Sequence, residues 1–593
     1  MKERIEIEDK YKWDLSNYCK NDEDFYKKIE ELKTLIERIK TFEGKLENDD
    51  ILLECWKTFD EFYDKIGRAE CYCSYRVDED QRNSKVNEMQ QKANKALTAF
   101  GEASSYIAPE ITSFSLEKLE KLKQNPKFEK YIPYIKDYIR AKGHTLSKEI
   151  ENFTSGMGEF LDDNSEIFEK FNNADVKFED VINSKQQKLP LNNANYSQYL
   201  ESNDRLLRES AFKNIHKGYG ENINFLTSNY TASVKKTCFF AKKRNYKSAL
   251  NEAIYLEEAS EGVYNKLIEK TRENIDIIHD FLYLKAKLLN INDFAIYDRA
   301  VRIGTQTDEE ISFETAIDEV CKAVAPLGEE YVGLVKKSVE EKWIDVYPNN
   351  GKRSGAYSCS VYGANPVVLL NFDNKESYVS TVAHELGHAI HSYYSNKFQP
   401  FQTCNYVIFV AEVASTVNEM LLWRYNIKKA KTKEEKIKFY DDLFQTINST
   451  IFRQTMFAEF EAMVHEMEEN ELPLTKDSLC EKYFELNKYY YGKDVKIPEE
   501  TKYEWARIPH FFTPFYVYKY ATGLICALNL SKKIAEKDKH AIEKYFKFLS
   551  SGSSEAPITL LADAGVNLEE DKTFDEVFAW MREVLNDFKE LMK

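Results

Sequence analysis

The clearest chemistry in the chain lies in residues 381–390, TVAHELGHAI, which contain His384-Glu385-Leu386-Gly387-His388. On a helix, residues four positions apart share one face, so the two imidazoles can bind one metal ion. With nine His in 593 residues, chance matches to this spacing number on the order of 0.01. The pattern predicts a site for one Zn²⁺, with Glu385 between the two imidazoles in the sequence. The alternative is a helix with two surface imidazoles and a solvated carboxylate.

A catalytic zinc ion needs a third protein ligand in addition to a water molecule. A third His six residues after the second is absent, because that position is Tyr394. The apolar stretch 405–427, NYVIFVAEVASTVNEMLLWRYNI, carries two acidic residues, Glu412 and Glu419. They are seven apart and share one helix face, where carboxylates rarely lie without a partner. Spacing favours Glu412 only modestly, so both remain candidates, and pairing of both with Lys or Arg is the alternative.

An aromatic segment, residues 505–523 (WARIPHFFTPFYVYKYATG), is a second candidate for chemistry. Its two prolines predict a loop that enters a helix. His510 is followed by Tyr516 and Tyr520, which are four apart and share a face, whereas Tyr518 points roughly opposite. A stripe of this kind is more often core than catalytic. His391, three residues after His388, is interpreted as a packing residue or a neighbour of the metal site.

Long helices are expected to position these groups, because Gly (20) and Pro (13) are scarce. Residues 22–42 place apolar side chains at three- and four-residue intervals, and similar patterns recur through residue 180. The polar stretch 184–197 is the best early boundary. We therefore predict a mainly α fold with an N-terminal helical lobe, residues 1–195, and a catalytic domain, residues 196–593.

The composition changes over residues 348–373, where three Gly lie between Pro348 and Pro366. There, Val367–Phe372 (VVLLNF) reads as a strand directly before the metal helix. We predict a small β-sheet next to that helix. Asp373 and Glu376 resemble a capping box that opens the helix.

Charge and targeting patterns exclude several classes. Lys plus Arg is 83 and Asp plus Glu is 100, a net charge of −17, so nucleic acid and anionic membranes are unlikely partners. The charged N-terminus has no apolar region typical of a secretory signal, and no stretch is apolar enough to span a membrane. The ten Cys are scattered and are interpreted as reduced thiols. These features predict a cytoplasmic protein.

The motifs in this order resemble the thimet oligopeptidase family of zinc metallopeptidases, specifically its oligoendopeptidase F branch. HELGHAIH, the helix with Glu412 and Glu419, and IPHFFTPFYVYKYATG carry the resemblance. KYKWDL (residues 10–15) and SNDRLLRESAF (residues 202–212) are also similar to that branch. The resemblance implies a mostly helical two-lobed shell around a deep channel, which admits short unfolded peptides and excludes folded proteins.

The resemblance also implies roles for single residues. It makes His384, His388 and Glu412 the zinc ligands and Glu385 the general base. It implies that His510 and tyrosines of the 516–520 segment bind substrate and stabilise the oxyanion; the helix-face argument favours Tyr516 and Tyr520.

The predicted function is zinc-dependent hydrolysis of internal bonds in oligopeptides. We further predict that the strand Val367–Phe372 pairs with the backbone of the peptide substrate. One alternative is a zinc hydrolase of a non-peptide substrate. Another is a helical peptide-binding scaffold whose metal site is inactive or structural. A cysteine nucleophile is the weakest alternative, because no Cys has a convincing His partner in the sequence. The oligomeric state stays open.

Overall fold

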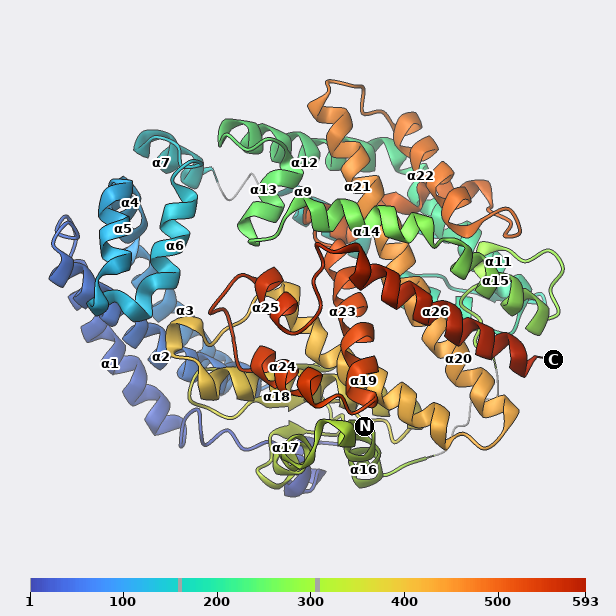
Figure 1. Cartoon of the computed structure of the whole chain (residues 1–593), viewed down its shortest axis with the longest axis horizontal. Coiled ribbons are helices and arrows are strands. Elements are labelled where there is room, and N and C mark those ends of the chain that lie inside the picture. The colour runs from blue at the N-terminus through green and yellow to red at the C-terminus, as the bar shows by residue number, and fades with distance from the viewer. Residues whose placement is uncertain (1, 158–162, 304–309, 593) are drawn as a thin grey trace. The chain divides into compact units, whose positions relative to one another are not determined.

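The computed structural model describes residues 2–157, 163–303 and 310–592. Helices make up most of this part of the chain, and the strands are short (Figure 1). This confirms the predicted mainly α fold with a small β-sheet. No described helix combines the length and the apolar composition that a bilayer crossing requires. The ten Cys are free thiols, and all but Cys359 are buried.

Contacts within the chain divide it into two compact units, each built from three separate stretches of sequence. The first unit contains residues 1–148, 307–425 and 530–565, and the second contains residues 149–306, 426–529 and 566–593. Three of the divisions fall inside helices: α7, α19 and α23. The predicted domain boundary at residue 195 stays a prediction.

The first unit contains the HExxH helix, α18. Its helices are α1 (Asp22–Lys40), α2 (Asp49–Glu79), α3 (Ser84–Ser104), α4 (Ile107–Ser113), α5 (Leu116–Gln124), α6 (Ile132–Ala141), α16 (Phe313–Val324), α17 (Glu329–Glu340), α18 (Val379–Phe398), most of α19 (Ile408–Lys429), α24 (Lys539–Leu549) and α25 (Pro557–Asp563). Helices α1 to α3 contact one another, and α18 contacts α16, α17 and α24.

Helix α1 illustrates how these helices follow from the sequence. Asn21 caps its N-terminus by accepting a hydrogen bond from the backbone N–H of Asp24. The stripe predicted from residues 22–42 is the buried face, with Phe25, Leu32 and Ile39 fully inaccessible to solvent. Burying such side chains contributes about 1.5–3 kcal/mol each, which holds α1 against α2 and α3.

A three-stranded sheet precedes α18 and contacts it through β4 and β5. Its order is β3 (Ile344–Asp345), β5 (Val367–Leu369), β4 (Tyr357–Cys359), with β5 parallel to β3 and antiparallel to β4. The predicted strand and its position beside the metal helix are thus confirmed. The prediction that it pairs with substrate is wrong, because β5 is central and both of its edges already carry hydrogen bonds. The edge strands of the sheet are β3 and β4.

The start of α18 also differs from the prediction. A 3₁₀ turn, Glu376–Tyr378, comes first, and the helix begins at Val379. The carboxylate of Asp373 accepts from the backbone N–H of Lys375 at 3.1 Å, so it closes a local turn instead of a capping box.

The second unit is also helical. It contains α7 (Lys148–Gly156), α9 (Asp163–Lys170), α10 (Asn193–Glu201), α11 (Arg205–Glu221), α12 (Ile223–Lys243), α13 (Ala249–Leu256), α14 (Glu261–Glu273), α15 (Asp276–Leu288), α20 (Lys433–Ile447), α21 (Arg453–Glu469), α22 (Lys476–Tyr491), most of α23 (Tyr518–Ala535), α26 (Asp571–Leu591) and the hairpin β1 (Val181–Ile182) and β2 (Lys188–Leu189).

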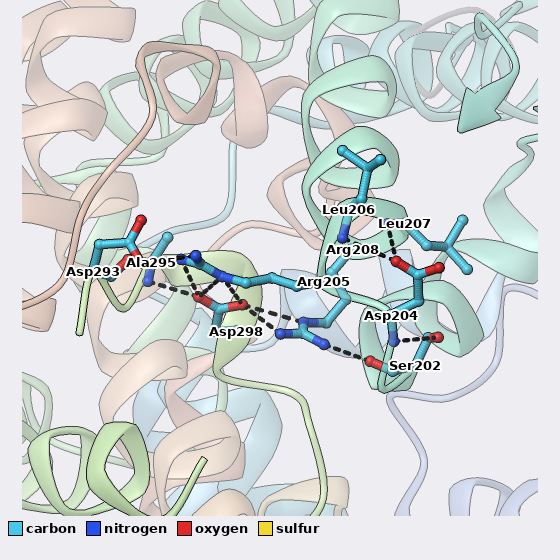
Figure 2. A network of polar contacts seen from close by, with 9 residues as sticks. All are labelled: Ser202, Asp204, Arg205, Leu206, Leu207, Arg208, Asp293, Ala295 and Asp298. Carbon is cyan, nitrogen blue, oxygen red and sulfur yellow. Dashed lines mark hydrogen bonds and ion pairs between the residues drawn. The ribbon is translucent and has the colours of Figure 1, made fainter. Parts of the chain in front are cut away.

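A buried ion cluster fastens the start of α11 in this unit. Figure 2 shows Asp298 between the side chains of Arg205 and Arg208. Its Oδ1 accepts from Arg208 Nη2 at 2.7 Å, and its Oδ2 accepts from Arg205 Nη2 at 3.1 Å and from the Ala295 N–H at 3.0 Å. The Asp298 side chain is fully buried, so these donors replace the water it has lost.

Candidate metal centre and active site

Helices α18 and α19 approach each other closely at Gly387, the fourth residue of the HExxH motif. A Cβ atom at Gly387 would lie 2.5 Å from Ser415 Cα and 2.8 Å from the carbonyl oxygen of Ala414. Both atoms belong to the α19 backbone and cannot rotate away. Glycine at this position therefore allows α19 to bring Glu412, one turn before Ser415, to the two imidazoles of α18.

Asn418 adds a polar link between the same two helices. Its buried amide donates to the Ala383 carbonyl oxygen on α18 at 3.0 Å. Its Oδ1 accepts from the hydroxyl of Tyr331 on α17 at 2.9 Å. The amide is thereby satisfied on both sides, which fixes the rotation of α19 against α18.

Three side chains meet at one point of this interface. His384 Nε2 lies 3.1 Å from His388 Nε2, and Glu412 Oε2 lies 3.4 Å from the first nitrogen and 3.5 Å from the second. In a tetrahedral zinc site with bonds of about 2.0–2.1 Å, ligand atoms are about 3.3–3.4 Å apart. The observed separations bracket this value, so His384, His388 and Glu412 fit a zinc ion.

Glu419, the second carboxylate considered in the sequence, contacts the opposite side of one imidazole. Its Oε1 accepts a hydrogen bond from His384 Nδ1. This bond directs the lone pair of Nε2 toward Glu412 and His388, as carboxylates behind metal-binding imidazoles commonly do. The structure therefore gives Glu412 and Glu419 different environments: the first joins the cluster, and the second orients His384.

Glu385 lies beside the cluster with its side chain almost buried. Its Oε2 is buried and has no hydrogen-bond partner among the described residues. Burial raises the pKa of Glu385, and the charges of His384 and His388 offset part of that rise. A buried carboxylate oxygen without a partner costs free energy, which is expected where the group acts on something other than the protein.

Burial and neighbouring charges act in opposite directions on the pKa values of His384 and Glu412. Burial lowers the pKa of His384, but the hydrogen bond and charge of Glu419, with the charges of Glu385 and Glu412, raise it to about 9. Burial raises the pKa of Glu412, but the hydrogen bond with His388 and the charges of both imidazoles bring it below its usual range. Three carboxylates around two imidazoles form a strongly cation-attracting site, which suits a divalent metal.

His391 does not join this cluster. It is buried, and its ring stacks on that of Tyr406 with centroids 3.8 Å apart. Burial, followed by the charge of His388, lowers its pKa to about 3. This environment agrees with the interpretation of His391 as a packing residue.

The aromatic candidates gather within the second unit. Tyr520 OH lies 3.4 Å from His510 Nε2, and the ring centroids of Tyr516 and Tyr520 are 5.5 Å apart. Tyr518 points elsewhere, as the helix-face argument predicts: it is fully buried, and its hydroxyl donates to Glu257 at 2.8 Å. His510, Tyr516 and Tyr520 thus form one group, while their roles stay predictions.

Two features of the sites escaped the sequence analysis. One is the glycine contact at Gly387, which becomes visible only when α19 is placed against α18. The other is Glu461 on α21, whose carboxylate binds the backbone next to Tyr516 (Phe515 N–H to Oε1, 2.8 Å). The sequence did carry an indication of Glu461, because FAEFEAMVHEM places acidic residues in an apolar helix, as the stretch with Glu412 does.

Comparison with known protein families finds matches that include parts of both units. Residues 198–580 match the model of peptidase family M3, and residues 110–178 match the model described as Oligopeptidase F. Oligopeptidase PepF of Bacillus subtilis is 34% identical over 100% of this chain and 88% of its own length. An oligoendopeptidase F homolog of Borreliella burgdorferi is also 34% identical, over 100% of both chains.

Solved structures agree with these relatives. The crystal structure of oligoendopeptidase-F from Enterococcus faecium is 28% identical, with a TM-score of 0.74 over 96% of this chain and 99% of that chain. A structure from Chlamydophila abortus is 30% identical and covers 100% of both chains with a TM-score of 0.94. The resemblance inferred from the motifs is confirmed: the chain belongs to peptidase family M3, within its oligoendopeptidase F group.

Proposed function

We propose that the chain is a zinc-dependent endopeptidase that hydrolyses internal bonds of short unfolded oligopeptides. The observation that carries this proposal is the spacing of His384, His388 and Glu412, whose donor atoms lie 3.1–3.5 Å apart beside the unpartnered Glu385 oxygen. Relatives named oligoendopeptidase F support the substrate class. Ten free thiols suit a reducing compartment, which supports the cytoplasm as its location.

The proposed chemistry assigns one task to each side chain of the cluster. Bound by His384, His388 and Glu412, a zinc ion supplies a Lewis acid for the scissile carbonyl and lowers the pKa of a water molecule to about 7. Glu385 accepts the proton of the attacking water and passes it to the leaving amine, a transfer worth roughly 10²–10⁴-fold. Glu419 keeps His384 in the tautomer whose Nε2 is free to bind metal.

We propose that His510, Tyr516 and Tyr520 contact substrate and donate hydrogen bonds to the developing oxyanion. Support comes from the resemblance of their segment to the family motif and from their grouping within the second unit. Each such donor is worth about 3–4 kcal/mol of transition-state stabilisation. Tyr516→Phe and Tyr520→Phe test the two hydroxyls separately, and wild-type kcat in both variants would contradict the assignment.

The strand order also bears on which strand could pair with a substrate backbone. Because β5 is central, we propose that an extended peptide adds to the outer edge of β4. Main-chain hydrogen bonds there would fix register without requiring one particular side chain, which suits an enzyme acting on many peptides. A peptide complex with the substrate away from Tyr357–Cys359 would contradict this placement.

The deciding experiment follows cleavage of a graded-length peptide mixture and of casein by mass spectrometry, with and without a zinc chelator. We expect internal cuts in the short peptides, intact casein, and loss of all cuts with chelator until zinc is restored. No cuts by a zinc-loaded sample would contradict the peptidase assignment and favour a non-peptide substrate or an inactive scaffold. Cleavage of casein at the same rate would contradict the size-limiting channel.

A further inference from the structure

Glu461 is a buried acid that the proposed chemistry does not use. It lies on α21 with no exposed surface. Its Oε1 accepts the backbone N–H of Phe515 at 2.8 Å, whereas its Oε2 has no partner among the described residues. Burying a carboxyl group with a single hydrogen-bond partner costs free energy. Its one hydrogen bond is therefore expected to have a structural or functional role.

The backbone that Glu461 holds is in an unusual conformation. Phe515 has φ +55°, in the left-handed region that bulky side chains rarely adopt. Its ring is buried against His465 at 4.6 Å and Tyr264 at 5.9 Å between centroids. A strained turn persists only when its surroundings hold it, and here Glu461 supplies the hydrogen bond and two rings supply the packing.

This turn sets the direction of the residues that follow. Tyr516 is the next residue, and its ring lies near those of His510 (6.1 Å) and Tyr520 (5.5 Å). Two residues further, Tyr518 is anchored to Glu257 at 2.8 Å. Two acids, Glu461 on α21 and Glu257 directly after α13, therefore hold the segment on either side of Tyr516.

We propose that Glu461 is a positioning residue: by binding the Phe515 N–H, it holds the strained turn that places Tyr516 and Tyr520 beside His510. This inference rests on the proposed role of those tyrosines in substrate binding and oxyanion stabilisation. Glu461 itself touches no reacting atom, so its effect is transmitted through the turn.

The environment of Glu461 indicates which substitution preserves this contact. Burial raises the pKa of Glu461 to about 8, although the Phe515 N–H and the charge of Lys519 oppose the rise. The side chain is therefore mostly a neutral acid near pH 7. Glutamine has the same shape and keeps a carbonyl oxygen for the Phe515 N–H, whereas methionine has a similar length and no such acceptor.

The test compares Glu461→Gln and Glu461→Met in the zinc-loaded enzyme. We expect Glu461→Met to lower kcat about 10²-fold, as loss of an oxyanion donor does, with little change in KM. Glu461→Gln should stay within about twofold of wild type. In a Tyr516→Phe/Tyr520→Phe background, Glu461→Met should lower kcat by less than about threefold, because the groups it positions are already gone.

Hydrogen–deuterium exchange gives a readout that does not depend on catalysis. The peptide covering residues 513–520 should exchange faster in Glu461→Met and at the wild-type rate in Glu461→Gln. Glu459→Met is the matched control: Glu459 is buried on the same helix and accepts from Tyr490 OH at 2.9 Å, so its loss should lower stability without changing kcat or KM.

The outcomes separate the two proposals. If Tyr516→Phe and Tyr520→Phe are fully active, the oxyanion assignment fails, but the exchange of residues 513–520 still tests Glu461. Wild-type exchange and kinetics in Glu461→Met would overturn the positioning role. Equal damage in Glu461→Gln and Glu461→Met would overturn it too, because the acceptor would then not be the property that matters.

Discussion

Each unit contains a group of buried or partly buried charged side chains, and the two groups differ in how completely their carboxylate oxygens are hydrogen-bonded. Around Asp298, both carboxylate oxygens accept hydrogen bonds, from Arg205, Arg208 and the Ala295 N–H (Figure 2). Around Glu385, the carboxylates of one small region face two imidazoles, and one buried oxygen has no partner among the described residues. The protein itself satisfies the first group, whereas the second keeps a buried oxygen to which the described residues donate no hydrogen bond.

This difference explains why residue type alone does not identify a site. Both groups contain acids in largely apolar surroundings. Complete pairing lets the Asp298 cluster hold the start of α11 in place, whereas incomplete pairing leaves the α18–α19 cluster able to take a cation, as the proposed function requires. A substitution in the α18–α19 cluster should therefore lower activity with little loss of stability. A substitution in the Asp298 cluster should lower stability with little loss of activity per folded molecule.

Glu385→Gln should have the largest effect. The amide cannot accept the proton of water, so we expect kcat to fall by at least 10²–10⁴-fold while zinc content and melting temperature stay near wild type. Single-turnover assays with metal analysis check this. Glu419→Gln alters only the orientation of His384, so we expect a smaller loss of activity than in Glu385→Gln and a metal affinity reduced about 10–100-fold. A Glu385→Gln variant with near-normal turnover would show that another group is the base.

Asp298→Asn should reverse that pattern. It leaves the buried Arg208 guanidinium without its counter-charge, so we expect a loss of about 3–5 kcal/mol of stability. Activity per folded molecule should persist. The control is Glu209→Gln on the same helix, which breaks a partly exposed pair with Lys213 and should cost less than about 1 kcal/mol. Denaturant unfolding with parallel kinetics checks both, and a kcat loss exceeding the unfolded fraction would contradict the comparison.

Much of the fold could be predicted from the sequence because its periodicity is regular. The stripe in residues 22–42 is the buried face of α1, and the first half of the apolar hexamer before the HExxH motif, Val367–Leu369, is a strand. The order of strands could not be predicted, since β3 is two residues long and pairs with β5 across more than twenty residues. That pairing makes β5 the central strand and leaves β3 and β4 at the edges of the sheet.

The meeting of His384 and His388 could be predicted because the two residues share a helix with a spacing that only a few functions need. The residue pattern alone left Glu412 and Glu419 both open, since both lie on one face of α19, and only the family resemblance selected Glu412. Which of the two carboxylates reaches both imidazoles depends on the position of α19 along α18. The contacts of Gly387 and Asn418 fix that position. Glu461 was missed for the same reason: its partner is a backbone N–H more than fifty residues away in the sequence.

Gly387→Ala tests whether this close approach builds the metal cluster. The added methyl group would meet the α19 backbone, so α19 must shift and carry Glu412 with it. We expect zinc affinity to fall about 10–100-fold, comparable to the loss of an orienting partner. Gly333→Ala on α17 is the matched control, because a Cβ there meets nothing within 4 Å. It should leave zinc binding unchanged, and equal affinities in both variants would contradict the role of Gly387.

Glu461 lies between the two extremes, buried like Asp298 but with one partner, so its effect should appear as a pH dependence of stability. With a pKa of about 8 in the folded chain and an ordinary value of 4.5, it keeps its proton on folding while the unfolded chain releases one. The stability it contributes is present below about pH 4.5 and is lost as pH rises toward 8, by up to about 1.4 kcal/mol per pH unit. Glu461→Gln removes this dependence, so wild type should lose stability relative to the variant between pH 5.5 and 7.5 in paired melts. The two proteins share the same metal cluster, so its own pH dependence cancels in the difference. A difference that stays constant across this range would mean that water or a neighbouring charge satisfies Glu461, which would place it with Asp298 among the compensated acids.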